Sequence, residues 1–102
     1  MLDEIERQRD ELIALCQRFR VQRLAVFGSA VTGEFRPGES DLDFLVEFEP
    51  EPSTGYVDRY FGLLEALEEL FGCKVDLVVA FAIKNPYFLE AIKRAEWVLY
   101  AA

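Results

Sequence analysis

Residues 40–48, which read SDLDFLVEF, constrain the fold of this chain more than any other stretch. Successive side chains of a β-strand point to opposite faces of the sheet, so Asp41 and Asp43 share one face and the alternate apolar residues share the other. Two neighbouring carboxylates at the start of an apolar strand repel each other unless a cation lies between them. Because hard oxygen ligands suit Mg²⁺, the pattern favours a divalent cation here. The alternate apolar residues are Leu42, Phe44, Val46 and Phe48.

A second strand is predicted over Lys74–Val79, where β-branched residues cluster. Its alternate apolar side chains share one face, which leaves Asp76 on the other. If this strand pairs with the strand that carries Asp41 and Asp43, with the apolar faces aligned, the three carboxylates meet at one site. Each carboxylate alone has an ordinary structural explanation, such as a turn cap or a surface ion pair. Three carboxylates on one face favour a functional site.

A short apolar strand over Leu24–Phe27 leads into Gly28 and Ser29, and a short helix is predicted from Ser29 to about Thr32. Backbone N–H groups at a helix start can bind an anion, Gly28 would let a phosphate approach the backbone, and Ser29 adds a hydroxyl. An ordinary strand-to-helix turn with a serine cap explains the same two residues. The nearby aspartates favour the phosphate interpretation.

Gly28-Ser29, followed by Asp41-x-Asp43 and a lone Asp76 on a later strand, resembles the nucleotidyltransferase superfamily built on the DNA polymerase β palm. Within it, the length and the SDLDFLVEF segment resemble the minimal nucleotidyltransferases, the MntA-type antitoxins paired with HEPN-domain toxins. The resemblance covers nearly the whole chain. It implies an α/β (α+β) fold with a small mixed sheet, helices packed mainly on one face, and a single domain over residues 1–102.

The resemblance also implies a chemistry for these residues. Asp41 and Asp43 would bridge two Mg²⁺ ions on the triphosphate of ATP, and Asp76 would complete the site as a metal ligand or as the base. Gly28 and Ser29 would hold the phosphates of the leaving pyrophosphate. AMP would pass to a tyrosine hydroxyl of a HEPN-domain toxin and silence it. Exposed aromatic side chains such as Tyr56, Tyr60, Phe81 or Tyr87 could form the docking surface for this partner, although a place in the core is favoured for most of them.

Two other functions fit the same residues. A binding-only antitoxin would neutralise its partner by contact, with a vestigial site. A nucleotidyltransferase of this kind could instead act on a small molecule or an RNA end. The presence of all three aspartates favours an active enzyme, and the net charge of −8 argues against a basic groove for direct nucleic-acid binding.

The chain departs from the family pattern in the loop Gly33–Glu39. Eleven residues separate Ser29 from Asp41, whereas ten are usual in the minimal family, and we interpret the extra residue as a tolerated insertion. Family members often carry an arginine near the position of Thr32. Arg36 could replace that charge or could simply be solvated, and the second interpretation is favoured.

Length and composition limit the remaining possibilities. With 102 residues, 52% of them hydrophobic, the chain is expected to form one small domain with one core. The absence of histidine and of a CxxC pair argues against zinc. Cys16 and Cys73 are expected to be buried free thiols in a reducing compartment. Because no apolar run approaches the length of a membrane span, a soluble, cytoplasmic protein without a membrane partner is expected.

The other elements follow from periodicity and capping signals. One amphipathic helix is predicted over residues 2–19, with loosely packed first turns. A second, over Tyr56–Phe71, is expected to be capped by Ser53 or Thr54, to carry Val57 on its buried side and to end at Gly72. A third is predicted from Asn85-Pro86 to Ile92 or Ala95, followed by a last strand over Trp97–Tyr100.

Overall fold

The computed structural model describes residues 1–50 and 55–102 of the chain. Helices and strands alternate along it in the predicted order, apart from the N-terminal helix, which is divided. The elements are α1 (Leu2–Arg7), α2 (Arg9–Arg18), β1 (Val21–Phe27), α3 (Ser29–Thr32), β2 (Leu42–Phe48), α4 (Tyr56–Phe71), β3 (Val75–Val79), the 3-10 helix η1 (Ala80–Ala82), α5 (Pro86–Ala95) and β4 (Trp97–Ala101).

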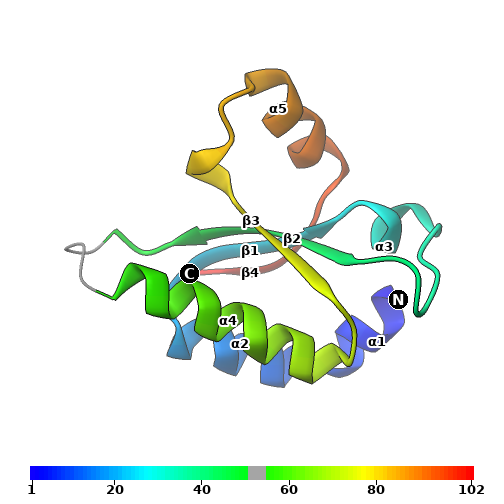
Figure 1. Cartoon of the computed structure of the whole chain (residues 1–102), viewed down its shortest axis with the longest axis horizontal. Coiled ribbons are helices and arrows are strands. Elements are labelled where there is room, and N and C mark those ends of the chain that lie inside the picture. The colour runs from blue at the N-terminus through cyan, green and yellow to red at the C-terminus, as the bar shows by residue number, and fades with distance from the viewer. Residues whose placement is uncertain (51–54) are drawn as a thin grey trace.

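The four strands form one mixed sheet in the order β3-β2-β1-β4. Strand β1 is antiparallel to both β2 and β4, and β2 is parallel to β3, so β3 and β4 are the edge strands. Helices α1, α2 and α4 lie along one face of the sheet, and α5 lies on the opposite side (Figure 1). The predicted α/β fold, with a small mixed sheet and helices mainly on one face, is confirmed.

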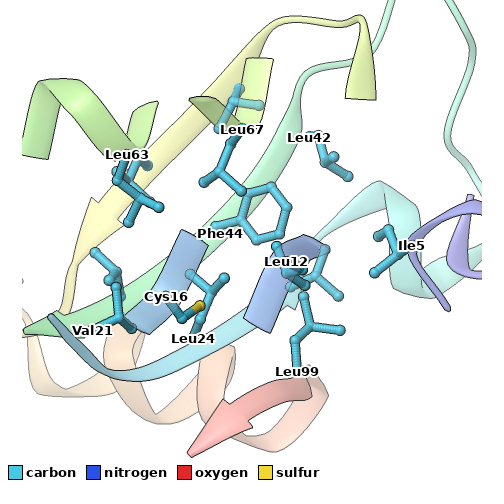
Figure 2. Packing of buried hydrophobic residues seen from close by; sticks show 14 of the residues in the cluster. Ile5, Leu12, Cys16, Val21, Leu24, Leu42, Phe44, Leu63, Leu67 and Leu99 are labelled. Carbon is cyan, nitrogen blue, oxygen red and sulfur yellow. The ribbon is translucent and has the colours of Figure 1, made fainter. Parts of the chain in front are cut away.

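The main core lies between the sheet and the helices α1, α2 and α4. Leu42, Phe44 and Val46 enter it from β2, as the alternation predicts, and Phe44 stacks on Phe71 at a ring-centroid distance of 6.0 Å. Figure 2 shows how side chains from both helices and strands converge in this core. The labelled side chains are Ile5, Leu12, Cys16, Val21, Leu24, Leu42, Phe44, Leu63, Leu67 and Leu99.

A smaller core lies on the opposite face of the sheet. It is built from Leu45 of β2, Ala80 of η1 and Ile92 of α5. Asp43 precedes Leu45 by two residues, so its side chain is on this same face. The face under α5 therefore has an apolar part, which η1 and α5 cover, and an acidic part at the start of β2.

The prediction of one N-terminal helix with loosely packed first turns is wrong. The helix is interrupted at Gln8, whose backbone N–H is shared between the carbonyls of Glu4 and Ile5. The Gln8 side chain instead donates to the Leu70 carbonyl, at 3.1 Å, and so satisfies a carbonyl in the last turn of α4. Ile5 is only 1% exposed, so the first turns are part of the core.

Helix α4 has the predicted bounds, and Gly72 ends it in the left-handed conformation. Val57 was expected on its buried side but is 63% exposed, because the first turn of α4 faces a groove beside the edge strand β3. The predicted caps Ser53 and Thr54 lie outside the described residues.

Helix α5 begins as predicted. Asn85 caps it by accepting hydrogen bonds from the N–H groups of Tyr87 and Phe88 at 2.9 and 3.3 Å, with Pro86 as its first residue.

Both cysteines are free thiols. Cys16 is buried as expected, whereas Cys73 is only half-buried, which corrects the expectation for that residue.

Candidate functional site

Strand pairing brings two of the predicted aspartates together. Strands β2 and β3 pair in parallel with Asp43 opposite Asp76, so these two side chains are neighbours on the sheet face that α5 partly covers. Asp41 directly precedes β2 and is exposed. The assumption that the two strands pair with aligned apolar faces is therefore confirmed.

The site concentrates negative charge. The pKa of Asp43 is raised, first by burial of its carboxyl group and then by the charges of Asp76 and Asp41. Across residues 1–50 and 55–102, no lysine or arginine forms an ion pair with any of these three aspartates. Ionising Asp43 in the isolated chain is thus opposed by its surroundings, and a cation at this position would remove that opposition.

Gly28 closes the site from the end of β1. Phe27 pairs with Asp43, and Gly28 follows with a φ of +74°. A Cβ atom at Gly28 would lie 2.4 Å from Oδ2 of Asp43, so only glycine leaves room for the carboxylate. The sequence pattern suggested that Gly28 makes room for a ligand; the structure adds that it makes room for Asp43 itself.

Ser29 and the short helix α3 follow directly. The helix spans Ser29–Thr32 as predicted, and its first turn is closed by bonds from the N–H groups of Val31 and Thr32 to the Gly28 carbonyl. Ser29 is half-buried and directly follows Gly28 in the chain; its predicted contact with a phosphate stays a prediction.

The donor set of the site fits Mg²⁺ that is shared with a bound phosphate. In the described part of the chain, no three acidic, histidine or cysteine side chains converge closely enough to hold a metal ion by themselves. Mg²⁺ in proteins is usually held by one or two carboxylates together with water and the phosphates of a substrate, and not by a complete protein cage. The pair Asp43 and Asp76, with Asp41 within electrostatic reach, matches that description.

Two residues of α4 support the site and were not singled out for this role from the sequence. The Tyr60 hydroxyl donates to the Leu77 carbonyl at 2.6 Å, and a Glu68 carboxylate oxygen accepts from the Val75 N–H at 3.2 Å. These bonds fix β3 on either side of Asp76. The pKa of Tyr60 is raised, first by burial of its hydroxyl group and then by the charge of Asp76. Helical periodicity places Tyr60 on the inner side of α4 but cannot identify its partner.

The lengthened loop is folded back onto the protein. Phe35 packs against the main core, and the turn Arg36–Ser40 is closed by a bond from the Arg36 N–H to Oγ of Ser40 at 3.0 Å. The Arg36 side chain is 79% exposed and lies 3.9 Å from the Glu39 carboxylate. The structure therefore agrees with the interpretation that Arg36 is solvated.

Comparison with known proteins gives one family for most of the chain. The nucleotidyltransferase domain family matches residues 10–96. The protein adenylyltransferase MntA of Thermococcus cleftensis is 44% identical over 84 residues, which cover 82% of this chain and 81% of that protein.

Solved structures share the same fold. One described as a minimal nucleotidyltransferase superimposes with a TM-score of 0.79 at 34% identity and covers 94% of this chain and 93% of that one. A complex of a tri-AMPylated Shewanella oneidensis HEPN toxin with an MNT antitoxin gives a TM-score of 0.64, with 95% of this chain and 72% of the other covered. At 16% identity, the latter similarity concerns the fold alone.

Proposed function

Because this chain belongs to the nucleotidyltransferase domain family, we propose that it transfers AMP from ATP to a tyrosine hydroxyl of a HEPN-domain toxin and thereby acts as its antitoxin. The observation that carries the proposal is the side-by-side placement of Asp43 and Asp76, with the Asp43 carboxylate against Gly28. Among the described residues, neither aspartate has a cationic partner. The name of the Thermococcus relative, a protein adenylyltransferase, supports the same reaction.

Asp41, Asp43 and Asp76 would hold Mg²⁺. When bound, the ions neutralise the triphosphate and the developing charge at the α-phosphorus. The raised pKa of Asp43 supports this role, since a cation supplies the favourable interaction that the carboxylate lacks in the isolated chain.

In the transfer, the acceptor hydroxyl oxygen bonds to the α-phosphorus, and the bond from that phosphorus to the pyrophosphate oxygen breaks. The hydroxyl proton needs an acceptor near the attacking oxygen. Asp76 is exposed on an edge strand, so an incoming acceptor protein can reach it, and it serves as the base or as the ligand next to the nucleophile. Gly28 and Ser29 contact the phosphates that leave as pyrophosphate.

The proposal is tested by mass spectrometry of a HEPN-domain toxin from the same organism after incubation with this protein, ATP and Mg²⁺. We expect a mass gain of one or more AMP units, confined to peptides that contain tyrosine. Asp43→Asn should abolish the gain, whereas Glu34→Gln, which changes an exposed carboxylate in the loop after α3, should leave it unchanged.

Two other results would point to other functions. Neutralisation of the toxin without any mass gain would identify a binding-only antitoxin. If the toxin neither gains mass nor forms a complex, the proposed acceptor is wrong and the transfer must be sought on small molecules or RNA ends.

A further inference from the structure

The edge strand β3 borders an apolar groove of about 410 Å³ on the side of α4. Val57 and Phe61 on its helix side are 63% and 54% exposed, although both are large apolar side chains. We call this surface the α4–β3 groove; it is lined by Tyr56, Val57, Tyr60, Phe61, Leu77, Val79 and Ala82. Exposed apolar surface of this kind marks an interaction site on a soluble domain.

The groove is suited to apolar side chains and not to a nucleotide or a small polar ligand. Small-molecule sites place a few polar groups where they converge on the ligand. Here the hydroxyl of Tyr60 is already engaged with the Leu77 carbonyl, and apart from Tyr56 the rest of the lining is aliphatic or phenyl. An occupant would therefore bind mainly by burying its own apolar surface.

The mode of binding is limited by the edge of β3. A partner that adds a strand needs the outward-facing N–H and C=O groups of that edge. Glu68 already occupies the N–H of Val75, and Tyr60 already occupies the carbonyl of Leu77. These contacts compete with strand addition at two positions of the edge and therefore favour a partner that presents side chains from a preformed element such as a helix.

The charge around the groove defines the partner further. Helix α4 carries four acidic residues and a single basic one, Arg59, and β3 adds Asp76. Helical spacing places Asp58 and Glu65 on the same exposed side as Val57 and Phe61. A second copy of this chain, which also has a net charge of −8, would bring like charges together, whereas a partner with basic residues beside its apolar side chains would be attracted.

The groove also lies next to the candidate site. Leu77 lines the groove and directly follows Asp76 in β3, so the two side chains point to opposite faces of the sheet. Among the described strands, β3 has no neighbour on its outer side. A protein seated in the groove can extend around this edge to the carboxylates. Of the docking candidates predicted from the sequence, Tyr56 and Tyr60 line the groove, whereas the exposed Phe81 and Tyr87 do not.

We propose that the α4–β3 groove is the docking site of the acceptor protein, which inserts apolar side chains flanked by lysine or arginine residues. This inference rests on the proposed function for the identity of the acceptor. It goes beyond that function in naming the surface, the binding mode and the charge of the partner.

The test uses Phe61→Lys and, independently, Val57→Lys, which place a cation in the apolar centre of the groove. The matched control is Trp97→Lys, because Trp97 is 47% exposed and lies on β4, the opposite edge strand. With a HEPN-domain toxin as the probe, both groove variants should raise the Kd about tenfold or more, and the control should not. ATP binding by the isolated chain should be unchanged in all three variants, which shows that the fold is intact.

AMP transfer separates this inference from the proposed function. The groove variants should need more acceptor for half-maximal rate while the rate at saturating acceptor stays near that of the wild type. If toxin binding weakens in the groove variants but the wild type transfers no AMP, the docking site stands and the proposed function fails.

Three results would overturn the docking site. The first is an unchanged affinity for the toxin in both groove variants, and the second is no binding of the toxin by the wild type. The third is a wild-type dimer in light scattering that Phe61→Lys converts to a monomer without changing the affinity for the toxin. The last result would assign the groove to a second copy.

Discussion

Asp43 combines a stability cost with its role in the candidate site. Its pKa is raised from the usual 3.8, so the folded, metal-free chain binds this proton more tightly than the unfolded chain does. Stability is therefore lost as the pH rises from 3.8 through the raised pKa, and the loss persists at pH 7. Active sites often carry such costs.

Removing this charge should stabilise the metal-free protein and abolish AMP transfer. We expect Asp43→Asn to melt at a higher temperature than the wild type at pH 7, and the difference to shrink below pH 3.8, where the wild-type carboxyl is protonated in both states. Thermal melts followed by circular dichroism across this pH range check it, with Glu34→Gln as the control. A lower melting temperature at pH 7 would contradict the sign of the effect.

Gly28 is the second residue where local geometry decides the site. Gly28→Ala would place a Cβ atom 2.4 Å from the Asp43 carboxylate and would force a side chain into a φ of +74°. We expect a loss of about 1–3 kcal/mol in the free energy of unfolding, together with weaker Mg²⁺-ATP binding.

Gly33→Ala is the matched control, because Gly33 has a φ of +84° but no neighbouring atom within 4 Å of the position that a Cβ atom would take. Urea unfolding and calorimetry measure both effects. Equal ATP binding by the two variants would show that Gly28 matters only for backbone conformation.

At the scale of elements, α5 is held over the sheet at both of its ends. Asn85 caps its start, and Glu96, just after its end, pairs with Arg23 of β1 through two hydrogen bonds, one of them 3.2 Å long. The Glu96 side chain is only 4% exposed, so its end of the ion pair is shielded from solvent. Helix α5, which covers the apolar part of the sheet face that carries Asp43, is thus fixed by polar contacts at its two ends and by the packing of Ile92 between them.

Loss of the cap should destabilise α5 by a measurable amount. Asn85→Ala removes the acceptor for two N–H groups and is expected to cost about 1 kcal/mol, whereas Asn85→Asp keeps the acceptor and should cost much less. Urea denaturation of both variants measures the difference. Equal losses in the two variants would indicate that the amide of Asn85, and not its cap, stabilises the helix start.

At the scale of the whole molecule, the two thiols differ in how deeply they are buried. Cys16 has no exposed surface in the main core, and burial raises its pKa to about 12. Cys73 is half-buried near the start of β3, and its pKa is also raised, mainly by burial. Because the thiolate is the reactive form, both thiols should react more slowly than a free cysteine, and Cys16 should be the slower.

Alkylation by iodoacetamide, followed by peptide mass spectrometry, should modify Cys73 first. Cys16 should stay protected until denaturant unfolds the chain globally, because no local opening exposes the centre of the core. The variant Cys73→Ser provides the signal of Cys16 alone. Similar rates for the two thiols in the native protein would contradict the burial of Cys16 in a well-packed main core.

Overall charge and helix length are further properties of the whole molecule. None of the described helices is long and apolar enough to cross a membrane. The net charge of −8 makes association with a basic partner dependent on salt, so the affinity for the proposed acceptor should fall as ionic strength rises.

Much of the fold follows from local rules that can be applied to the sequence. Alternation placed Leu42, Phe44 and Val46 in the core with Asp43 opposite them, and capping signals located the start of α5 at Asn85 and the end of α4 at Gly72. The family was predicted from Gly28-Ser29, Asp41-x-Asp43 and Asp76 and is confirmed. The metal ions and the roles of these residues stay predictions.

Other features depend on contacts between residues far apart in the chain. The N-terminal helix is interrupted at Gln8, whose side chain donates to the Leu70 carbonyl, and Val57 is exposed because the first turn of α4 faces a groove beside the edge strand β3. Neither partner can be read from local periodicity.

The site shows the same division. Residue types and spacing were sufficient to select the three aspartates, because alternation along each strand is a local property. Only the parallel pairing of β2 with β3 places Asp43 beside Asp76, and only the packing of β1 against β2 places Gly28 on the Asp43 carboxylate. Register and strand order are set by the burial of all the apolar faces together, so tertiary structure alone decides them.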